Sequence, residues 1–173
     1  MISEIAKNSL RFLILVLLQT LIIKNIALGT YFVPLPYIMF LLMLPFETMP
    51  LLVLILSFVI GLTVDVFYDS QGIHASACVV LGFARFYSLK LLSPREGYEI
   101  TMKPTVQMMG NAWFLYYALP LILTHHLFFF FLEEFGFGDA GFTLLKAIGS
   151  TFVTFVFVYI FQFLFYRKDG IAA

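Results

Sequence analysis

The sequence predicts an all-α integral membrane protein, a single domain over residues 1–173 built as a bundle of six transmembrane helices. Of its residues, 62% are hydrophobic and 12% are charged, and the mean hydropathy is +1.00. A soluble domain is about 25% charged, so this chain has too little polar surface to face water. Its apolar residues form continuous runs, whereas a membrane β-barrel needs alternating apolar and polar residues. These observations exclude a soluble enzyme.

Six apolar segments account for most of the chain. They lie at about residues 10–29, 31–46, 50–68, 74–92, 111–132 and 141–166. We expect the first to be retained as a helix, because Ile26-Ala27-Leu28-Gly29 makes a poor signal-peptide cleavage site. The second is short, since its 16 residues rise about 24 Å against a hydrocarbon core of about 30 Å. A re-entrant segment is therefore the alternative to a span at this position.

Prolines fit these boundaries. Pro34 and Pro36 fall in the predicted first turn of 31–46, where a missing N–H costs little, and Pro45 falls near its end. Pro50 begins the third segment. Pro120 lies in the middle of 111–132 and should kink that helix.

The positions of the basic residues favour six crossings with both termini in the cytoplasm. Under that topology the cytoplasmic basic residues outnumber the external ones by seven to two, as the positive-inside rule requires. The cytoplasmic set is Lys7, Arg11, Lys90, Arg95, Lys103, Arg167 and Lys168, and the external set is Lys24 and Lys146. If 31–46 does not cross, three are inside against six outside, which violates the rule. A short second helix then implies tight burial or local thinning of the bilayer.

The third and fourth segments must pack side by side, because the connection between them is very short. Both carry small residues at helical spacing, which allow close approach. These are Ser57 and Gly61 on the third segment, and Ala75, Cys78 and Gly82 on the fourth. Cys78 is the single cysteine, so an internal disulfide is excluded.

Asp65 lies about one turn inside the outer end of the third segment, where a carboxylate needs a partner. One interpretation is a helix-end carboxylate that reaches the interface or hydrogen-bonds to the turn at residues 70–74. The other is a polar cluster of Asp65, Asp69 and His74 that binds a cation or relays protons. The spacing of these three residues is a weak signal for a metal.

Arg85 lies near the middle of the fourth segment, where a lone guanidinium is costly and must find an acceptor. Pairing with Asp65 requires a tilted or bent helix, and the alternative is snorkelling toward the cytoplasm beside Lys90. His125 and His126 are adjacent and point about 100° apart, so they cannot both bind one metal ion. We expect them to form a polar patch near the outer interface.

Two further regions are candidates for contact with partner proteins. Small residues of the last segment, Ala147, Ser150, Thr151 and Thr154, form a face that is either an internal seam or a docking site for another protein's helix. The cytoplasmic connection 93–104 contains Pro94, Arg95, Glu96, Gly97 and Tyr98. It is either a loop anchored at the interface by Tyr98 and Lys103 or a surface that contacts a partner.

These motifs together resemble the MreD family of rod shape-determining membrane proteins, in its Gram-negative branch. The resemblance rests on Gly61-Leu62-x2-Asp65 followed by Gly72-x-His74-Ala75, on Pro34, Pro36 and Pro45, and on the helix with Arg85 and its loop from Ser93 to Glu99. It covers nearly the whole chain, although the last two segments match only in character. Thr63 and Gln71 depart from the family's usual aliphatic and apolar residues.

The resemblance implies a non-enzymatic scaffold of the cell-elongation complex in the bacterial inner membrane. Family members bind the transmembrane helix of MreC and help to link MreB filaments to peptidoglycan synthesis by RodA and its penicillin-binding partner. Their fold is similar to that of the six-helix substrate-binding (S-component) subunits of vitamin transporters. A homodimer is compatible with this function.

The sequence itself contains no nucleophile with a base, no paired acid and base, and no phosphate-binding glycine loop. The numbers of basic and acidic residues are equal, so the net charge does not indicate a nucleic-acid partner. We therefore expect no enzymatic activity, metal or cofactor. The alternative function is a small-solute binding subunit or transporter in which Asp65, His74 and Arg85 contact a polar ligand.

Overall fold

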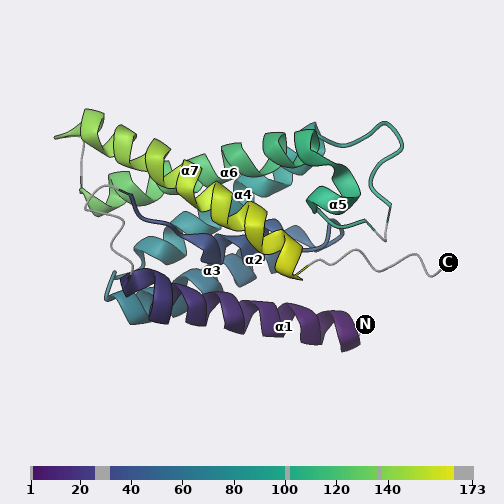
Figure 1. Ribbon diagram of the computed structural model, residues 1–173, viewed down its shortest axis with the longest axis horizontal. Coiled ribbons are helices and arrows are strands. Elements are labelled where there is room, and N and C mark those ends of the chain that lie inside the picture. Colours follow the sequence, from purple (N-terminus) through teal and green to yellow (C-terminus); the bar gives the residue numbers. More distant parts are fainter. Residues whose placement is uncertain (1, 26–31, 100–101, 136–137, 166–173) are drawn as a thin grey trace.

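The computed structural model describes residues 2–25, 32–99, 102–135 and 138–165. It is 78% helical, and no strand occurs within those ranges. The helices run along the long axis of the molecule (Figure 1). The start of α1 (Ile2–Leu17), the short α5 (Val106–Met109) and the end of α7 (Ala140–Phe165) lie at one end of the bundle. The predicted all-α class is confirmed, whereas residues 26–31, Arg167 and Lys168 lie outside the described residues.

Four of the described helices are long and apolar enough to span a membrane. The first is α1 continued by a π-helical turn, Leu18–Ile22, and a 3-10 turn, Ile23–Asn25. The others are α3 (Pro50–Tyr68), α6 (Asn111–Glu133) and α7. Large apolar side chains on their outer faces, such as Val66 and Phe152, are 70% and 66% exposed. Such a surface suits lipid and not water, so the chain is a membrane protein.

The fourth predicted segment forms α4 (Ile73–Leu91), within one residue of the expected bounds. This helix is not among the four, and it carries the polar and charged residues His74, Arg85 and Lys90. It packs against α3 on one side and against α6 on the other, and α6 in turn packs against α7. His74 and Arg85 are both buried, so α4 places polar side chains at the centre of the bundle.

The second predicted segment is not the expected helix. Residues 32–35 have no helical structure, and a 3-10 turn, Pro36–Ile38, leads into the short α2 (Met39–Leu42). These two helical pieces together rise only about 12 Å. Pro34 and Pro36 cause the difference, because a proline pushes the residue before it away from helical geometry. We call residues 32–45 the broken segment.

The broken segment lies in the core of the bundle. Leu35 and the residues from Tyr37 to Leu44 are at most 3% exposed, and Pro36 is also buried. The Phe40 ring packs edge-on against Phe12 of α1 at 5.3 Å between centroids, and the Tyr37 ring packs against His74 of α4 and His125 of α6. The long helices therefore surround this segment.

The α3–α4 hairpin is as closely packed as the small residues predict. A Cβ atom added at Gly61 would lie 2.4 Å from the Ala75 Cα and 2.6 Å from the His74 carbonyl oxygen. One added at Gly82 would lie 2.4 Å from the Ser57 hydroxyl. Between the helices, Asp69 and Gly72 adopt positive φ angles of 54° and 91°, which turn the chain sharply.

Gly61→Ala should destabilise the protein by about 1–3 kcal/mol, because the added methyl group meets backbone that cannot move aside. Thermal unfolding in one detergent measures this as a lowered Tm. Gly141→Ala on α7 is the matched control, since a Cβ there meets nothing within 4 Å. Equal Tm values for the two variants would contradict the close packing.

Candidate functional site

Asp65 ties the end of α3 to the start of α4. One carboxylate oxygen accepts hydrogen bonds from the Ser70 hydroxyl at 2.6 Å and the His74 N–H at 3.0 Å, and the other accepts one from the Ala75 N–H at 2.8 Å. The first N–H groups of a helix have no partner within the helix, so a carboxylate from a neighbouring helix satisfies them well. The interpretation of Asp65 as a partner of the 70–74 turn is confirmed.

The cation cluster of Asp65, Asp69 and His74 does not form. Asp69 is exposed in the turn, whereas the His74 ring is buried and contacts Tyr37. Within the described ranges no three His, Cys, Asp or Glu side chains are placed to hold a metal ion. Asp65 therefore serves the backbone of the hairpin.

Arg85 does not bond Asp65 and instead bonds the end of the broken segment and Tyr117. Its Nη2 donates to the Leu44 carbonyl at 2.6 Å and the Pro45 carbonyl at 3.3 Å, and its Nε donates to the Tyr117 hydroxyl at 2.9 Å. The Tyr117 hydroxyl in turn donates to the Leu42 carbonyl at 2.9 Å. The considered pairing with Asp65 is wrong, because the break after α2 offers Arg85 carbonyl groups that no helix satisfies. Arg85 and Tyr117 together cap the end of α2.

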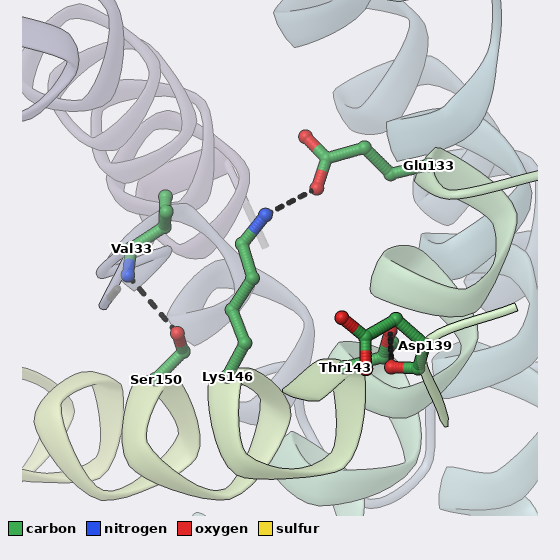
Figure 2. A network of polar contacts seen from close by, with 6 residues as sticks. All are labelled: Val33, Glu133, Asp139, Thr143, Lys146 and Ser150. Atoms are coloured by element: carbon green, nitrogen blue, oxygen red, sulfur yellow. Dashed lines mark hydrogen bonds and ion pairs between the residues drawn. The ribbon is translucent and has the colours of Figure 1, made fainter. Parts of the chain in front are cut away.

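The other end of the broken segment is bonded by α7 and α1. The Val33 and Leu35 N–H groups donate to the hydroxyls of Ser150 and Thr154, both at 3.0 Å. Figure 2 shows the first of these bonds beside the ion pair between Lys146 and Glu133, 2.8 Å apart, which joins α7 to α6. The Gln19 side chain, in the π-helical turn that continues α1, donates to the Pro34 carbonyl at 3.4 Å.

The small-residue face of α7 is thus an internal seam. Its four residues, Ala147, Ser150, Thr151 and Thr154, are at most 4% exposed. A docking helix cannot reach them, because the broken segment of the same chain covers this face. The expectation of a docking site there is wrong, and the alternative of an internal seam is confirmed.

His125 and His126 lie in the core and not in a patch at the outer surface, since both are 0% exposed. The His126 Nδ1 lies 2.8 Å from the Ile122 carbonyl and must donate to it, which leaves Nε2 to accept from the Thr154 hydroxyl at 3.1 Å. His126 therefore supports the α7 seam. His125 instead faces Tyr37, with 3.1 Å between its Nε2 and the Tyr37 hydroxyl.

The connection 93–104 begins with a turn beside which Tyr98 is held by aromatic packing. The Tyr98 ring stacks on Phe46 at 4.0 Å between centroids and donates its hydroxyl to the Leu89 carbonyl at 3.0 Å. Burial raises the pKa of the Tyr98 phenol above its ordinary value, so the group stays a neutral donor. The Gly97 N–H donates to the Pro94 carbonyl, and the residues between them, Arg95 and Glu96, are exposed. Tyr98 thus holds the connection to the bundle, and Arg95 and Glu96 form an accessible tip. Anchoring at the membrane interface by Tyr98 and Lys103 stays a prediction.

An open groove of about 740 Å³ runs beside the α3–α4 hairpin. Its walls are mostly apolar and come from α3, α4 and α6, with polar side chains at the turn end. The lining includes Phe58, Leu62, Val66, Val79 and Phe128, and the polar residues Gln71 and Ser76. We call this surface the hairpin groove. Because Leu62 and Val66 are exposed on its rim, the groove opens toward lipid.

Comparisons of the chain with protein-family models, with curated proteins and with solved structures found no match.

Sequence reasoning did not identify Gln19, Tyr37 and Tyr117 as site residues. All three are fully buried and bond groups on other elements. Their one signal in the sequence is that each is a polar side chain within an apolar segment.

Asp65→Asn should lower the stability by about 1–3 kcal/mol, because the amide replaces an acceptor oxygen with a donor that faces buried N–H groups or the Ser70 hydroxyl. The measurement is the Tm in detergent. Asp69→Asn removes the same charge from the exposed turn, where asparagine tolerates the positive φ, and should leave the Tm nearly unchanged. A similar loss of Tm in both variants would show that the negative charge, and not the capping of α4, accounts for the stability.

Tyr117→Phe should cost about 1–3 kcal/mol, since it leaves the Leu42 carbonyl and the Arg85 Nε without their partner. Tyr116→Phe serves as control, because it makes the same change at the preceding residue of α6, where the side chain is 67% exposed. Urea or thermal unfolding of both variants in one detergent compares them. An unchanged midpoint for Tyr117→Phe would overturn the role given to this hydroxyl.

Proposed function

We propose that this chain is a scaffold subunit of the cell-elongation complex in the bacterial inner membrane, of the MreD type and without enzymatic activity. It binds the transmembrane helix of MreC and links MreB filaments indirectly to peptidoglycan synthesis by RodA and its penicillin-binding partner. Through these contacts it maintains cell shape. The proposal begins from the resemblance of the hairpin motif and the cytoplasmic connection, and the geometry of both supports it.

The observation that carries the proposal is the role of the motif residues in the hairpin. Gly61 lets the two helices touch, Asp65 caps α4, and Gly72 adopts the positive φ of the turn. These contacts fix the α3 and α4 walls of the hairpin groove. A rigid apolar groove that opens to lipid is suited to an apolar helix, because helix association in a bilayer depends on packing.

The arrangement of the helices supports six crossings with both termini in the cytoplasm. The start of α1 and the end of α7 lie at the same end of the bundle (Figure 1), as an even number of crossings requires. The broken segment supplies the second crossing as buried irregular backbone, which a membrane tolerates when protein surrounds it. Lys90, Arg95 and Lys103 then face the cytoplasm together, in keeping with the positive-inside rule.

The exposed tip of the cytoplasmic turn supports contact with the filament side of the complex. Arg95 and Glu96 project from a turn whose neighbour Tyr98 is fixed between Phe46 and Trp113. An anchored turn loses little conformational freedom on binding, which favours recognition.

A solute-binding function receives no comparable support. Asp65 and His74 lie at the start of α4, while Arg85 lies about three turns further along the helix and bonds carbonyl groups. The three residues do not line one cavity. A relation to the S-component fold stays an expectation from the resemblance.

Val79→Trp should reduce co-purification of MreC about tenfold or more. A bulky ring in the groove costs an interface about 1–3 kcal/mol, and 1.4 kcal/mol is tenfold in affinity. Phe83→Trp is the matched control, because Phe83 lies one turn further along α4, is exposed, and does not line the groove. The measurement is the amount of MreC retained by the tagged chain in mild detergent.

Two results would count against the proposal. Failure of the unmodified chain to retain MreC would contradict the function itself. Equal retention by both variants would leave the function standing and exclude the hairpin groove as the docking site.

A further inference from the structure

The buried polar side chains near the broken segment fall into two groups. Ser150, Thr154, Arg85 and Tyr117 bond its backbone, so their presence in an apolar core has a structural cause. The side chain of Tyr37 instead faces the rings of His74 and His125 and bonds no backbone group in the described ranges. Burying ionisable groups in a membrane protein is costly. A buried cluster of such side chains that bonds no backbone group therefore indicates a function.

Tyr37 stands between two histidines from different helices. Its hydroxyl oxygen lies 2.9 Å from Nδ1 of His74 on α4 and 3.1 Å from Nε2 of His125 on α6. The three side chains are 0%, 1% and 0% exposed in the order Tyr37, His74, His125. We call them the His–Tyr–His chain.

The outer nitrogen of each ring is left without a partner. His74 Nε2 and His125 Nδ1 are buried and have no hydrogen-bond partner in the described parts of the protein. A neutral histidine carries one N–H, and the tyrosine hydroxyl carries one proton. When both hydrogen bonds point the same way along the chain, one outer nitrogen bears a proton and the other bears a free lone pair.

We propose that the His–Tyr–His chain is a proton relay between α4 and α6, with buried water as the donor and acceptor at its two ends. Water protonates the free outer nitrogen of one ring. That ring passes its inner proton to the tyrosine oxygen, the tyrosine passes its own proton to the second ring, and the second ring releases its outer proton to water. One proton enters, one leaves, and both hydrogen bonds reverse direction.

Other polar groups lie beside both ends of the His–Tyr–His chain. The Tyr68 ring lies 5.1 Å from the His74 ring, and the Tyr68 hydroxyl accepts from Gln19 of α1 at 2.8 Å. The His126 ring lies 5.3 Å from the His125 ring. The relay itself consists of the three side chains of the His–Tyr–His chain, and these neighbours lie outside it.

Two nearby groups, Asp65 and Cys78, affect how the His–Tyr–His chain can transfer protons. The Asp65 carboxylate is occupied by backbone N–H groups of α4 and by Ser70, so it does not accept the relay proton. The Cys78 sulfur lies 3.5 Å from the Tyr37 oxygen and 3.8 Å from His125 Nε2. If Tyr37 donated its proton to this sulfur while His74 and His125 both donated to the Tyr37 oxygen, no proton could pass from one histidine to the other.

Proton flux into proteoliposomes tests the proposal. The unmodified protein, in vesicles that contain a pH-sensitive dye and carry a potassium diffusion potential, should acidify the lumen faster than protein-free vesicles. Tyr37→Phe keeps the ring and should reduce the rate to that of protein-free vesicles. Tyr68→Phe removes a hydroxyl from a neighbouring ring outside the chain and should retain most of the flux.

Three flux results would overturn the relay: no flux above protein-free vesicles, an unchanged rate in Tyr37→Phe, or equal loss in Tyr68→Phe. A second measurement needs no variant and covers a Tyr37→Phe protein that does not fold. ¹⁵N NMR of histidine-labelled protein in nanodiscs should find His74 and His125 in the same tautomer, both protonated on Nε2 or both on Nδ1. Protonation of His74 on Nδ1 with His125 on Nε2 would exclude the relay.

Discussion

The backbone of the broken segment must find its hydrogen bonds inside the protein, and the rest of the structure depends on this constraint. Within a bilayer, an irregular stretch of chain buried among helices must pair most of its N–H and carbonyl groups with other groups of the protein. Side chains of α1, α4, α6 and α7 therefore converge on residues 32–45, and each bonds N–H or carbonyl groups that a regular helix would have paired internally. Pro34, Pro36 and Pro45 reduce the requirement, because they have no N–H to satisfy.

The same constraint explains why an arginine can lie in the core. Carbonyl groups at the end of a helix carry partial negative charge, so they stabilise a guanidinium without a carboxylate nearby. The five donors of arginine also reach several acceptors at once, as Arg85 does with Leu44, Pro45 and Tyr117. Asp65 is the complementary case, a carboxylate held by the N–H groups at the start of α4.

Apolar length alone was sufficient to predict the four spanning helices and the bounds of α4, because a buried helix pairs its own backbone whatever lies around it. The broken segment could not be found this way, since hydropathy does not register backbone geometry and its prolines also suit a helix start. Ser150 and Thr154 were ambiguous because small hydroxyl residues serve helix packing and backbone bonding equally. Tyr37, His74 and His125 are far apart in sequence, so no local pattern brings them together.

The contacts of α7 also have a consequence for the order of assembly. Ser150 and Thr154 lie 117 and 119 residues after the backbone groups they bond. During synthesis the N–H groups of Val33 and Leu35 must wait for the last helix, and until then they need water, a chaperone or the insertion machinery. The amino-terminal half of this protein is thus inserted as an incomplete structure, and the arrival of α7 closes it.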